Sequence, residues 1–356
     1  MAILTLLLED DQPFQPRQAR EHAGGSGAAG HRQPRARMIV PDALHRAGGN
    51  HRVADAGRGY EQDSHAPEAL ARLAAARPRG HMPVMTTIAY LPARGVIGIE
   101  GPDRVAFLQG LVSNDVTKAE PGRAVWSALL TPQGRYLAEF FILTDGESLL
   151  LDAPGVAVPD LIRRLSRFRL RSQVALRDRS DEFAVHAAWG GAPSAPGAIV
   201  AADPRLPAAG HRLLAPAPLA GAADETAYRA HRLALGLPDH DDLEPEKTLL
   251  MEAGFGDLHG IDWDKGCYMG QELTARTRYR GLVKRRLVPV DAEADLPAAG
   301  AITAGEREVG TLRTSLGRRG LALLRLDALD ARLSLDGIAL TPEIPSWMTL
   351  PETATP

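Results

Sequence analysis

The chain has 356 residues, of which 44% are hydrophobic and 24% charged, and its formal net charge is −3. This composition is typical of a soluble globular protein with two or three domains, and it argues against a global nucleic-acid or membrane-surface character. A single cysteine excludes an intramolecular disulfide and fits a reducing compartment. No apolar run reaches the roughly 20 residues that a membrane span needs. We therefore expect a cytoplasmic protein with no membrane partner, for which nucleic acid is an improbable ligand.

Residues 1–84 differ from the rest of the chain. They contain six of the eleven histidines but no lysine, and their only aromatic residues are Phe14 and Tyr60. Such a segment cannot bury enough apolar surface to offset its ordering entropy. We interpret it as a disordered extension or as upstream sequence translated by mistake. An Arg-rich organelle transit peptide is an alternative, although its acidic residues count against that. Met85 begins what we take as the true domain.

Regular patterns start beyond Met85. We predict a strand at 96–100, a helix from Asp103 to about 111, and strands at 124–130, 136–143 and 148–152. A helix follows from Pro159, with Leu161, Ile162, Leu165 and Phe168 facing inward. The order of strand, helix, strands and helix favours an α+β layer fold over a doubly wound parallel sheet.

The second half continues with a Gly/Ala/Pro-rich stretch at 190–218, which we predict to be a variable connecting loop. A helix is expected from Asp224 to Gly236, and residues 239–246 form an acidic loop. Short strands are predicted at 286–290, 301–303, 309–315, 321–325, 332–335 and 338–340, which suggests a small antiparallel barrel. The tail beyond Pro345 is expected to be loosely held.

The least common chemistry lies in the octapeptide from Lys265 to Glu272, which holds Cys267. We predict a glycine-bounded turn that opens a helix near Met269 or Gly270, with Glu272 in its first turn. A thiol before a helix start and close to a lysine has two influences that lower a cysteine pKa. The pattern therefore indicates a functional cysteine, although a small buried hydrophobe is the alternative.

The octapeptide and its basic continuation resemble the signature of the folate-binding YgfZ-type proteins, which are relatives of a mitochondrial iron–sulfur assembly factor. Their fold is similar to that of the aminomethyltransferase (T-protein) of the glycine cleavage system. The segment Phe107–Gly110 with Asn114–Val116 resembles the first domain of that fold. The resemblance implies an aminomethyltransferase-like, multi-domain α+β fold. Its folate-binding region would span 85–285, with a possible split near 180–220, and a C-terminal β-barrel would span 286–345.

The resemblance also implies a bound tetrahydrofolate or related reduced folate. Tyr228 matches the position of a folate-contacting tryptophan in the family, and the second such tryptophan would fall near Arg94, where this chain has no aromatic residue. The basic run from 276 to 286 could meet the glutamate tail of the folate or, alternatively, an RNA backbone. The expected folate contacts are Tyr228, Tyr268, Gln271, Glu272, Arg276 and Arg278.

The implied function is assistance in iron–sulfur cluster assembly or repair, with Cys267 and Lys265 as the chemical residues and iron–sulfur proteins as clients. Stable clusters are mostly held by four protein ligands, so one sulfur cannot hold a resident metal cluster. Two alternatives stay open. One is a folate-dependent aminomethyl transferase, in which Glu139 replaces an acidic pair whose first member here is Ala138, although we expect Glu139 to be a solvent-facing strand residue. The other is a tRNA-modification accessory protein.

Overall fold

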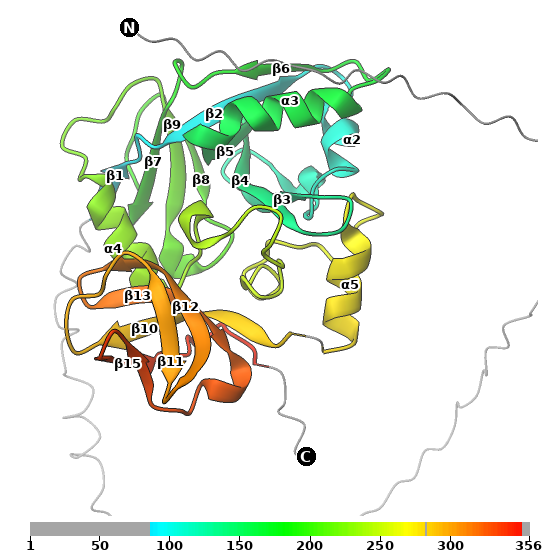
Figure 1. The fold of residues 1–356 in the computed structure, drawn as a ribbon. Coiled ribbons are helices and arrows are strands. Elements are labelled where there is room, and N and C mark those ends of the chain that lie inside the picture. Colours follow the sequence, from blue (N-terminus) through cyan, green and yellow to red (C-terminus); the bar gives the residue numbers. More distant parts are fainter. Residues whose placement is uncertain (1–85, 282, 351–356) are drawn as a thin grey trace, which may run out of the picture. The chain divides into compact units, whose positions relative to one another are not determined.

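The computed structural model describes residues 86–281 and 283–350, so the predictions for residues 1–84 lie outside it. The described chain contains two antiparallel sheets, a closed barrel and a small number of helices (Figure 1). Within the described residues, no helix is both long enough and apolar enough to cross a membrane.

A five-stranded sheet has the order β3-β4-β5-β2-β6 and is antiparallel throughout. Its strands are β2 (Arg94–Glu100), β3 (Val125–Leu130), β4 (Tyr136–Thr144), β5 (Leu149–Pro154) and β6 (Ala175–Asp178). Alternate residues face opposite sides: Ile97 and Phe140 pack under helices α2 (Arg104–Gln109) and α3 (Val158–Phe168), whereas Val96 and Phe141 join the second core. The sheet therefore separates two apolar layers.

Helix α3 departs from its prediction at its last residue. Leu161 and Leu165 are buried as expected, but Phe168 is 41% exposed. Phe168 lies three residues after Leu165 and stays on the same side of the helix, but it is the last residue of α3, and no residue that the structure describes covers it fully.

A four-stranded sheet has the order β1-β7-β9-β8, from strands β1 (Thr87–Tyr90), β7 (Ala184–Trp189), β8 (Ile199–Ala202) and β9 (His211–Ala215). The prediction of a connecting loop at 190–218 is therefore wrong, because β8 and β9 lie inside it. Both strands are only four or five residues long, and β9 pairs on both sides. Cross-strand pairing outweighs the alanine-, glycine- and proline-rich local composition here.

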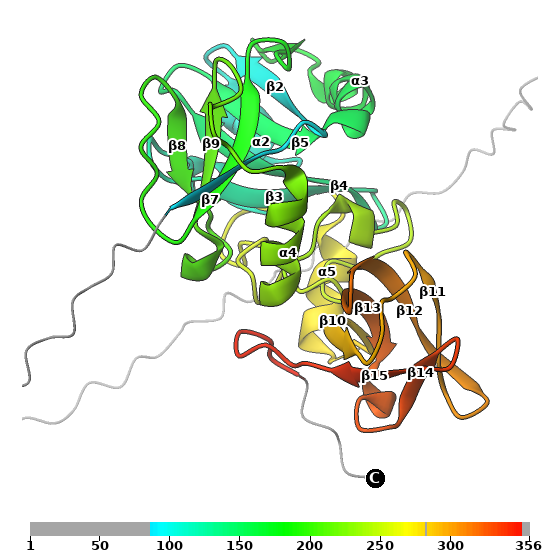
Figure 2. The same cartoon turned by 90° about the vertical axis from the view of Figure 1, so that its left-hand side faces the viewer.

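Helix α4 (Glu225–Leu235) has clear start and stop signals. The Asp224 side chain accepts a hydrogen bond from the Ala227 amide, and Gly236 ends the helix in the left-handed conformation with φ of 71°. The helix lies between the four-stranded sheet and the barrel (Figure 2). It thereby places Tyr228 and Arg232 at the centre of the described chain.

The barrel closes in the order β10-β13-β12-β11-β14-β15. Its strands are β10 (Arg285–Ala292), β11 (Gly300–Ala304), β12 (Arg307–Leu316), β13 (Arg319–Arg325), β14 (Leu333–Leu335) and β15 (Ile338–Pro342). The expectation of a loose tail beyond Pro345 is wrong up to residue 350. Met348 is buried, and the Trp347 indole donates a hydrogen bond of 2.9 Å to the Leu235 carbonyl at the end of α4.

Candidate functional site

Cys267 is a free, exposed cysteine in the loop that leads into helix α5 (Gln271–Tyr279). The predicted helix start is confirmed to within a residue or two, because Gly270 stands at the N-cap with φ of 81° and Glu272 lies in the first turn. The thiol is thus accessible and lies four residues before the first residue of α5.

The loop before the cysteine is held at several points. The Asp262 carboxylate accepts hydrogen bonds of 2.9 Å from the amides of Asp264 and Lys265. The Lys265 ammonium donates to the carbonyls of Val112 (2.8 Å) and Asn114 (2.6 Å). These contacts join the octapeptide to the 107–116 segment, which is the other stretch whose sequence resembles the family.

The 107–116 segment is in turn bonded to the chain just before the loop. The Asn114 amide donates to the carbonyls of Trp126 (2.7 Å) and His259 (2.6 Å). The Ser113 hydroxyl donates to the Gly260 carbonyl at 2.7 Å. Cys267 therefore stands on a loop whose base is bonded to residues 112–114, which are themselves bonded to β3, and this limits how far the thiol can move.

Lys265 lies close to the thiol in sequence, and its ammonium also makes contacts that position the loop. Burial lowers the pKa of Lys265 to about 8, although the Asp115 and Asp262 carboxylates oppose this. Its ammonium also lies 5.3 Å from the centre of the Tyr268 ring, a cation–π distance. The contacts of Lys265 thus fix the loop that carries the thiol.

The structure divides the predicted folate contacts between two places. Tyr268 is buried, which raises the pKa of its hydroxyl to about 12. Gln271, Glu272, Arg276 and Arg278 lie on α5, where Arg276 pairs with Glu272 and the Arg278 guanidinium lies 4.0 Å from the Trp263 ring centre. Tyr228 lies on α4 and lines a different cavity.

The basic run from 276 to 286 is not one cationic surface. Arg285 pairs with Glu252 at 3.1 Å, and Arg286, which is buried, pairs with Asp257 at 2.5 Å. Arg280 and Lys284 are exposed. The last two arginines of the run therefore bind the barrel to the preceding segment, and fewer cations are left for a polyanion.

A second polar cluster lies at the centre of the described chain, around Arg94. Its guanidinium bonds the Glu139 carboxylate at 2.9 Å, the Asp152 carboxylate, and the Asp239 carboxylate at 3.3 Å. The expectation that Glu139 faces solvent is wrong, since its exposure is 1%. Its other oxygen accepts a hydrogen bond of 2.8 Å from the Trp126 indole. Burial of a carboxylate requires such pairing, and Arg94 supplies it.

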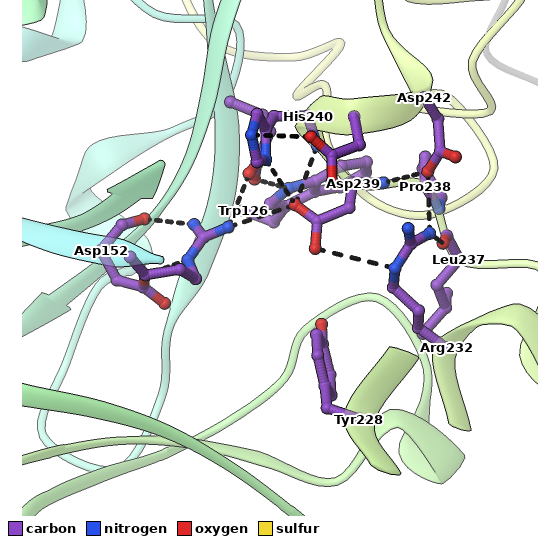
Figure 3. Close-up of polar contacts among 12 residues, drawn as sticks. Trp126, Asp152, Tyr228, Arg232, Leu237, Pro238, Asp239, His240 and Asp242 are labelled. Atoms are coloured by element: carbon purple, nitrogen blue, oxygen red, sulfur yellow. Dashed lines mark hydrogen bonds and ion pairs between the residues drawn. The ribbon is translucent and has the colours of Figure 1, made fainter. Parts of the chain in front are cut away.

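Tyr228 and Arg232 extend this cluster along α4 (Figure 3). The Tyr228 hydroxyl accepts hydrogen bonds from Arg212 (2.9 Å) and Arg205 (3.2 Å). The Arg232 guanidinium donates to the Asp242 carboxylate at 2.8 Å and lies 3.8 Å from that of Asp239. Three of these arginines, Arg94, Arg205 and Arg212, also lie over aromatic rings, among them that of Phe141.

A cavity of about 290 Å³ opens beside this cluster. Its walls come from the β1–β2 turn, from α4 and from the acidic loop, and they include Arg94, Glu225, Tyr228, Arg229, Asp239 and His240. Burial, helped by repulsion from Asp239 and Asp241, raises the pKa of Glu225. The Arg229 Nε is buried and has no hydrogen-bond partner among the described residues. The cavity can therefore offer both a carboxylate and a guanidinium to a polar ligand.

His240 and Asp239 form a coupled pair at the rim. Burial opposes the charge on His240, but hydrogen bonds to Asp239 (3.4 Å) and Asp241 (3.0 Å) raise the pKa of His240 to about 10. Burial likewise opposes the charge on Asp239, yet His240, Arg94 and Arg232 hold the pKa of Asp239 well below its ordinary value. Both side chains are charged at neutral pH.

Sequence reasoning missed Arg94, Asp152 and Asp239 as members of a site. The sequence marks Arg94 only as a position without an aromatic ring, and Asp152 only as the end of a strand. The acidic residues at 239–246 were the one sequence signal for this cluster, because carboxylates in such a loop can form ion pairs with buried arginines.

Comparisons with known proteins agree with this architecture. Residues 284–350 match the family described as CAF17, C-terminal beta-barrel domain. The solved structure of the glycine cleavage system aminomethyltransferase T from Bartonella henselae superposes with a TM-score of 0.60 over 74% of this chain and 86% of that chain, at 14% sequence identity. The chain therefore has the aminomethyltransferase-like fold with a small C-terminal antiparallel barrel, as predicted.

Closer relatives are found by sequence. The iron–sulfur cluster assembly factor IBA57, mitochondrial, of Mus musculus is 30% identical over 311 residues, which cover 74% of this chain and 86% of the mouse protein. The Homo sapiens protein of the same name is 30% identical, covering 72% and 84%. The IBA57 homolog of Mycosarcoma maydis is 37% identical over 227 residues, covering 57% and 56%. The chain belongs to the IBA57 family of iron–sulfur cluster assembly factors.

The expectation of a cytoplasmic protein is overturned by the same comparison, because these relatives are all named as mitochondrial proteins. The error has a physical origin. Cysteine usage reports the redox state of a compartment and does not identify the compartment.

Proposed function

We propose that this protein assists the assembly or repair of iron–sulfur clusters by presenting the Cys267 thiol to a client protein. The observation that carries the proposal is an exposed thiol on an anchored loop, in a chain whose relatives are named for cluster assembly. A single sulfur supplies one of the four ligands that a stable cluster needs. The remaining ligands must come from the client or from another molecule.

Replacement of the thiol tests this proposal. In cells that lack their own family member, the Cys267→Ser chain should fail to restore the activity of a cluster-dependent enzyme, at an unchanged level of the protein. Gly266→Ser is the matched control, because a Cβ at Gly266 meets no atom within 4 Å and the thiol next to it is kept. Full restoration by Cys267→Ser would remove the thiol from the function.

We propose in addition that the cavity beside Tyr228 binds a reduced folate. The donor set supports this: the half-buried Glu225 carboxylate suits the donor edge of an aminopyrimidinone ring, and Arg229 suits a glutamate carboxylate. Tyr228 also lines this cavity. The volume of about 290 Å³ lies at the lower limit for ligand sites.

Titration with tetrahydrofolate tests the second proposal. Binding to the intact chain should weaken by roughly tenfold in Arg229→Gln, since a charge-assisted hydrogen bond contributes about 1.5–3 kcal/mol. Arg123→Gln, at an exposed arginine away from the cavity, should leave the affinity unchanged. Equal affinities of the Arg229→Gln variant and the unaltered chain would exclude this pocket.

One alternative loses support from the geometry of Glu139. Both of its carboxylate oxygens are engaged, one with Arg94 and the other with the Trp126 indole. A general base for aminomethyl transfer needs a free oxygen within reach of the reacting nitrogen. We therefore favour the assembly function over the transferase.

A further inference from the structure

The end of helix α3 and the residues after it carry an unusual surface. The stretch from 163 to 171 contains five arginines. Arg163 and Arg164 pair with Asp160. The other three, which are Arg167, Arg169 and Arg171, are exposed and form no ion pair or side-chain hydrogen bond with any residue that the structure describes.

Two large apolar side chains alternate with these cations. Phe168 is 41% exposed and Leu170 is 88% exposed. Leu170 also has φ of 40°, a conformation that a leucine adopts at a cost of roughly 1 kcal/mol. A solvated helix end would place glycine or a polar residue there, so the alternation of arginine with bare apolar groups suits a surface that another molecule covers.

A small groove connects this surface to the cysteine loop. Its volume is about 210 Å³, and its walls include Pro132 of the β3–β4 turn, Arg167 and Phe168 of α3, and Met269. Met269 lies two residues after Cys267, and its amide is bonded to the Gly110 carbonyl at 3.1 Å. The turn lies close against the same loop, since a Cβ at Gly134 would lie 2.7 Å from the Gly270 carbonyl oxygen. The groove thus runs from the exposed arginines to the chain segment that carries the thiol.

We propose that this surface, residues 164–171 with the groove, docks an acidic segment of the client protein. This rests on the proposed function, which supplies the need for a client beside Cys267. The three arginines would meet carboxylates, Phe168 and Leu170 would pack on an apolar side chain, and the groove has room for one such side chain. The charge of the three arginines suits an acidic partner, and the apolar pair favours a protein over a nucleic acid, because Leu170, the more exposed of the two at 88%, offers no stacking face to a base.

A direct binding measurement tests the surface with a defined probe. The probe is a short fluorescent peptide in which glutamates surround a Leu-Met pair, and its anisotropy is followed with the full chain at low and high salt. The combined variant Arg167→Glu, Arg169→Glu, Arg171→Glu should weaken binding at least roughly tenfold. The matched control reverses three cations elsewhere, at Arg123, Lys284 and Arg332, and should bind as the unaltered chain does.

A second variant isolates the apolar part. Leu170→Gly removes an exposed side chain at a positive φ that glycine adopts freely, so its folding stability should not fall. Peptide affinity should still drop severalfold. Cys267→Ser should leave peptide binding unchanged, which separates a failure of docking from a failure of the thiol function.

Three results would overturn the proposal. One is the absence of peptide binding, and another is equal loss of binding in the patch variant and in the control. The third is tighter, patch-dependent binding of single-stranded RNA or of phosphatidylglycerol vesicles than of the peptide, which would assign the surface to a polyanion or a membrane.

Discussion

Arg94 shows how a single side chain can organise a buried polar centre. It contacts the carboxylates of Glu139, Asp152 and Asp239, and its exposure is 9%. Removal of one partner from a buried pair typically costs 3–5 kcal/mol because the other charge is left without compensation. The strands β2, β4 and β5 and the acidic loop are therefore coupled through one guanidinium.

The coupled charges at the cavity rim predict a stability that depends on pH. The pKa of His240 is raised to about 10, so its contribution is complete below pH 6.5 and is lost as the pH rises toward 10. The His240→Gln variant should lose this slope, and the difference should be on the order of 1–2 kcal/mol because the side chain is 29% exposed. Urea unfolding at a series of pH values measures it.

Other groups also titrate in this pH range, but they contribute equally to the stability of the unaltered chain and of the His240→Gln variant. The lowered pKa of Lys265, about 8, makes stability rise as the pH passes from 8 to its ordinary value of 10.5. This contribution is present in both chains. The Asp239→Asn variant should reduce the alkaline loss without abolishing it, because the Asp239 carboxylate raises the pKa of His240 together with that of Asp241. An unchanged alkaline slope in both variants would contradict the coupling.

At the scale of elements, sequence patterns predicted most of the strands and helices, but they did not predict how the strands are divided and ordered in the two sheets. Helix α4 was predictable from Asp224 and Gly236, because capping is local chemistry. Strands β8 and β9 were not, since their stability comes from cross-strand pairing with residues remote in the chain.

The candidate site, like the fold, was predictable from the sequence only in part. The accessible thiol and the helix beginning after it could be foreseen from eight consecutive residues. The Arg94 cluster could not, because its members come from β2, β4, β5 and the 239–242 turn and share no spacing in the chain. The orientation of Glu139 depended on which face of β4 holds buried arginines, and strand alternation alone does not specify that.

For the whole molecule, the junction of α4 with the barrel is set by Gly236. A Cβ at this position would lie 2.6 Å from Cγ of Pro289 in β10 and 3.0 Å from Cγ of Pro345. Gly236→Ala should therefore destabilise the protein by about 1 kcal/mol for the positive φ and by a further 1–3 kcal/mol for the steric overlap. Thermal or urea unfolding measures the loss.

Gly305→Ala supplies the control for that junction. Gly305 has φ of 62°, close to the 71° of Gly236, but a Cβ there meets no atom within 4 Å. It should show only the conformational part of the loss. Equal losses in the two variants would mean that the barrel and the helix are not closely packed at this point.

The anchored loop gives this chain one sulfhydryl that a reagent can reach, since Cys267 is its sole cysteine and is exposed. Maleimide labelling would therefore install a single tag per polypeptide, and its rate would act as a footprint of whatever sits over the loop. A client that covers the sulfur would slow the tagging in proportion to its occupancy, so the stoichiometry of the complex could be read from one covalent bond.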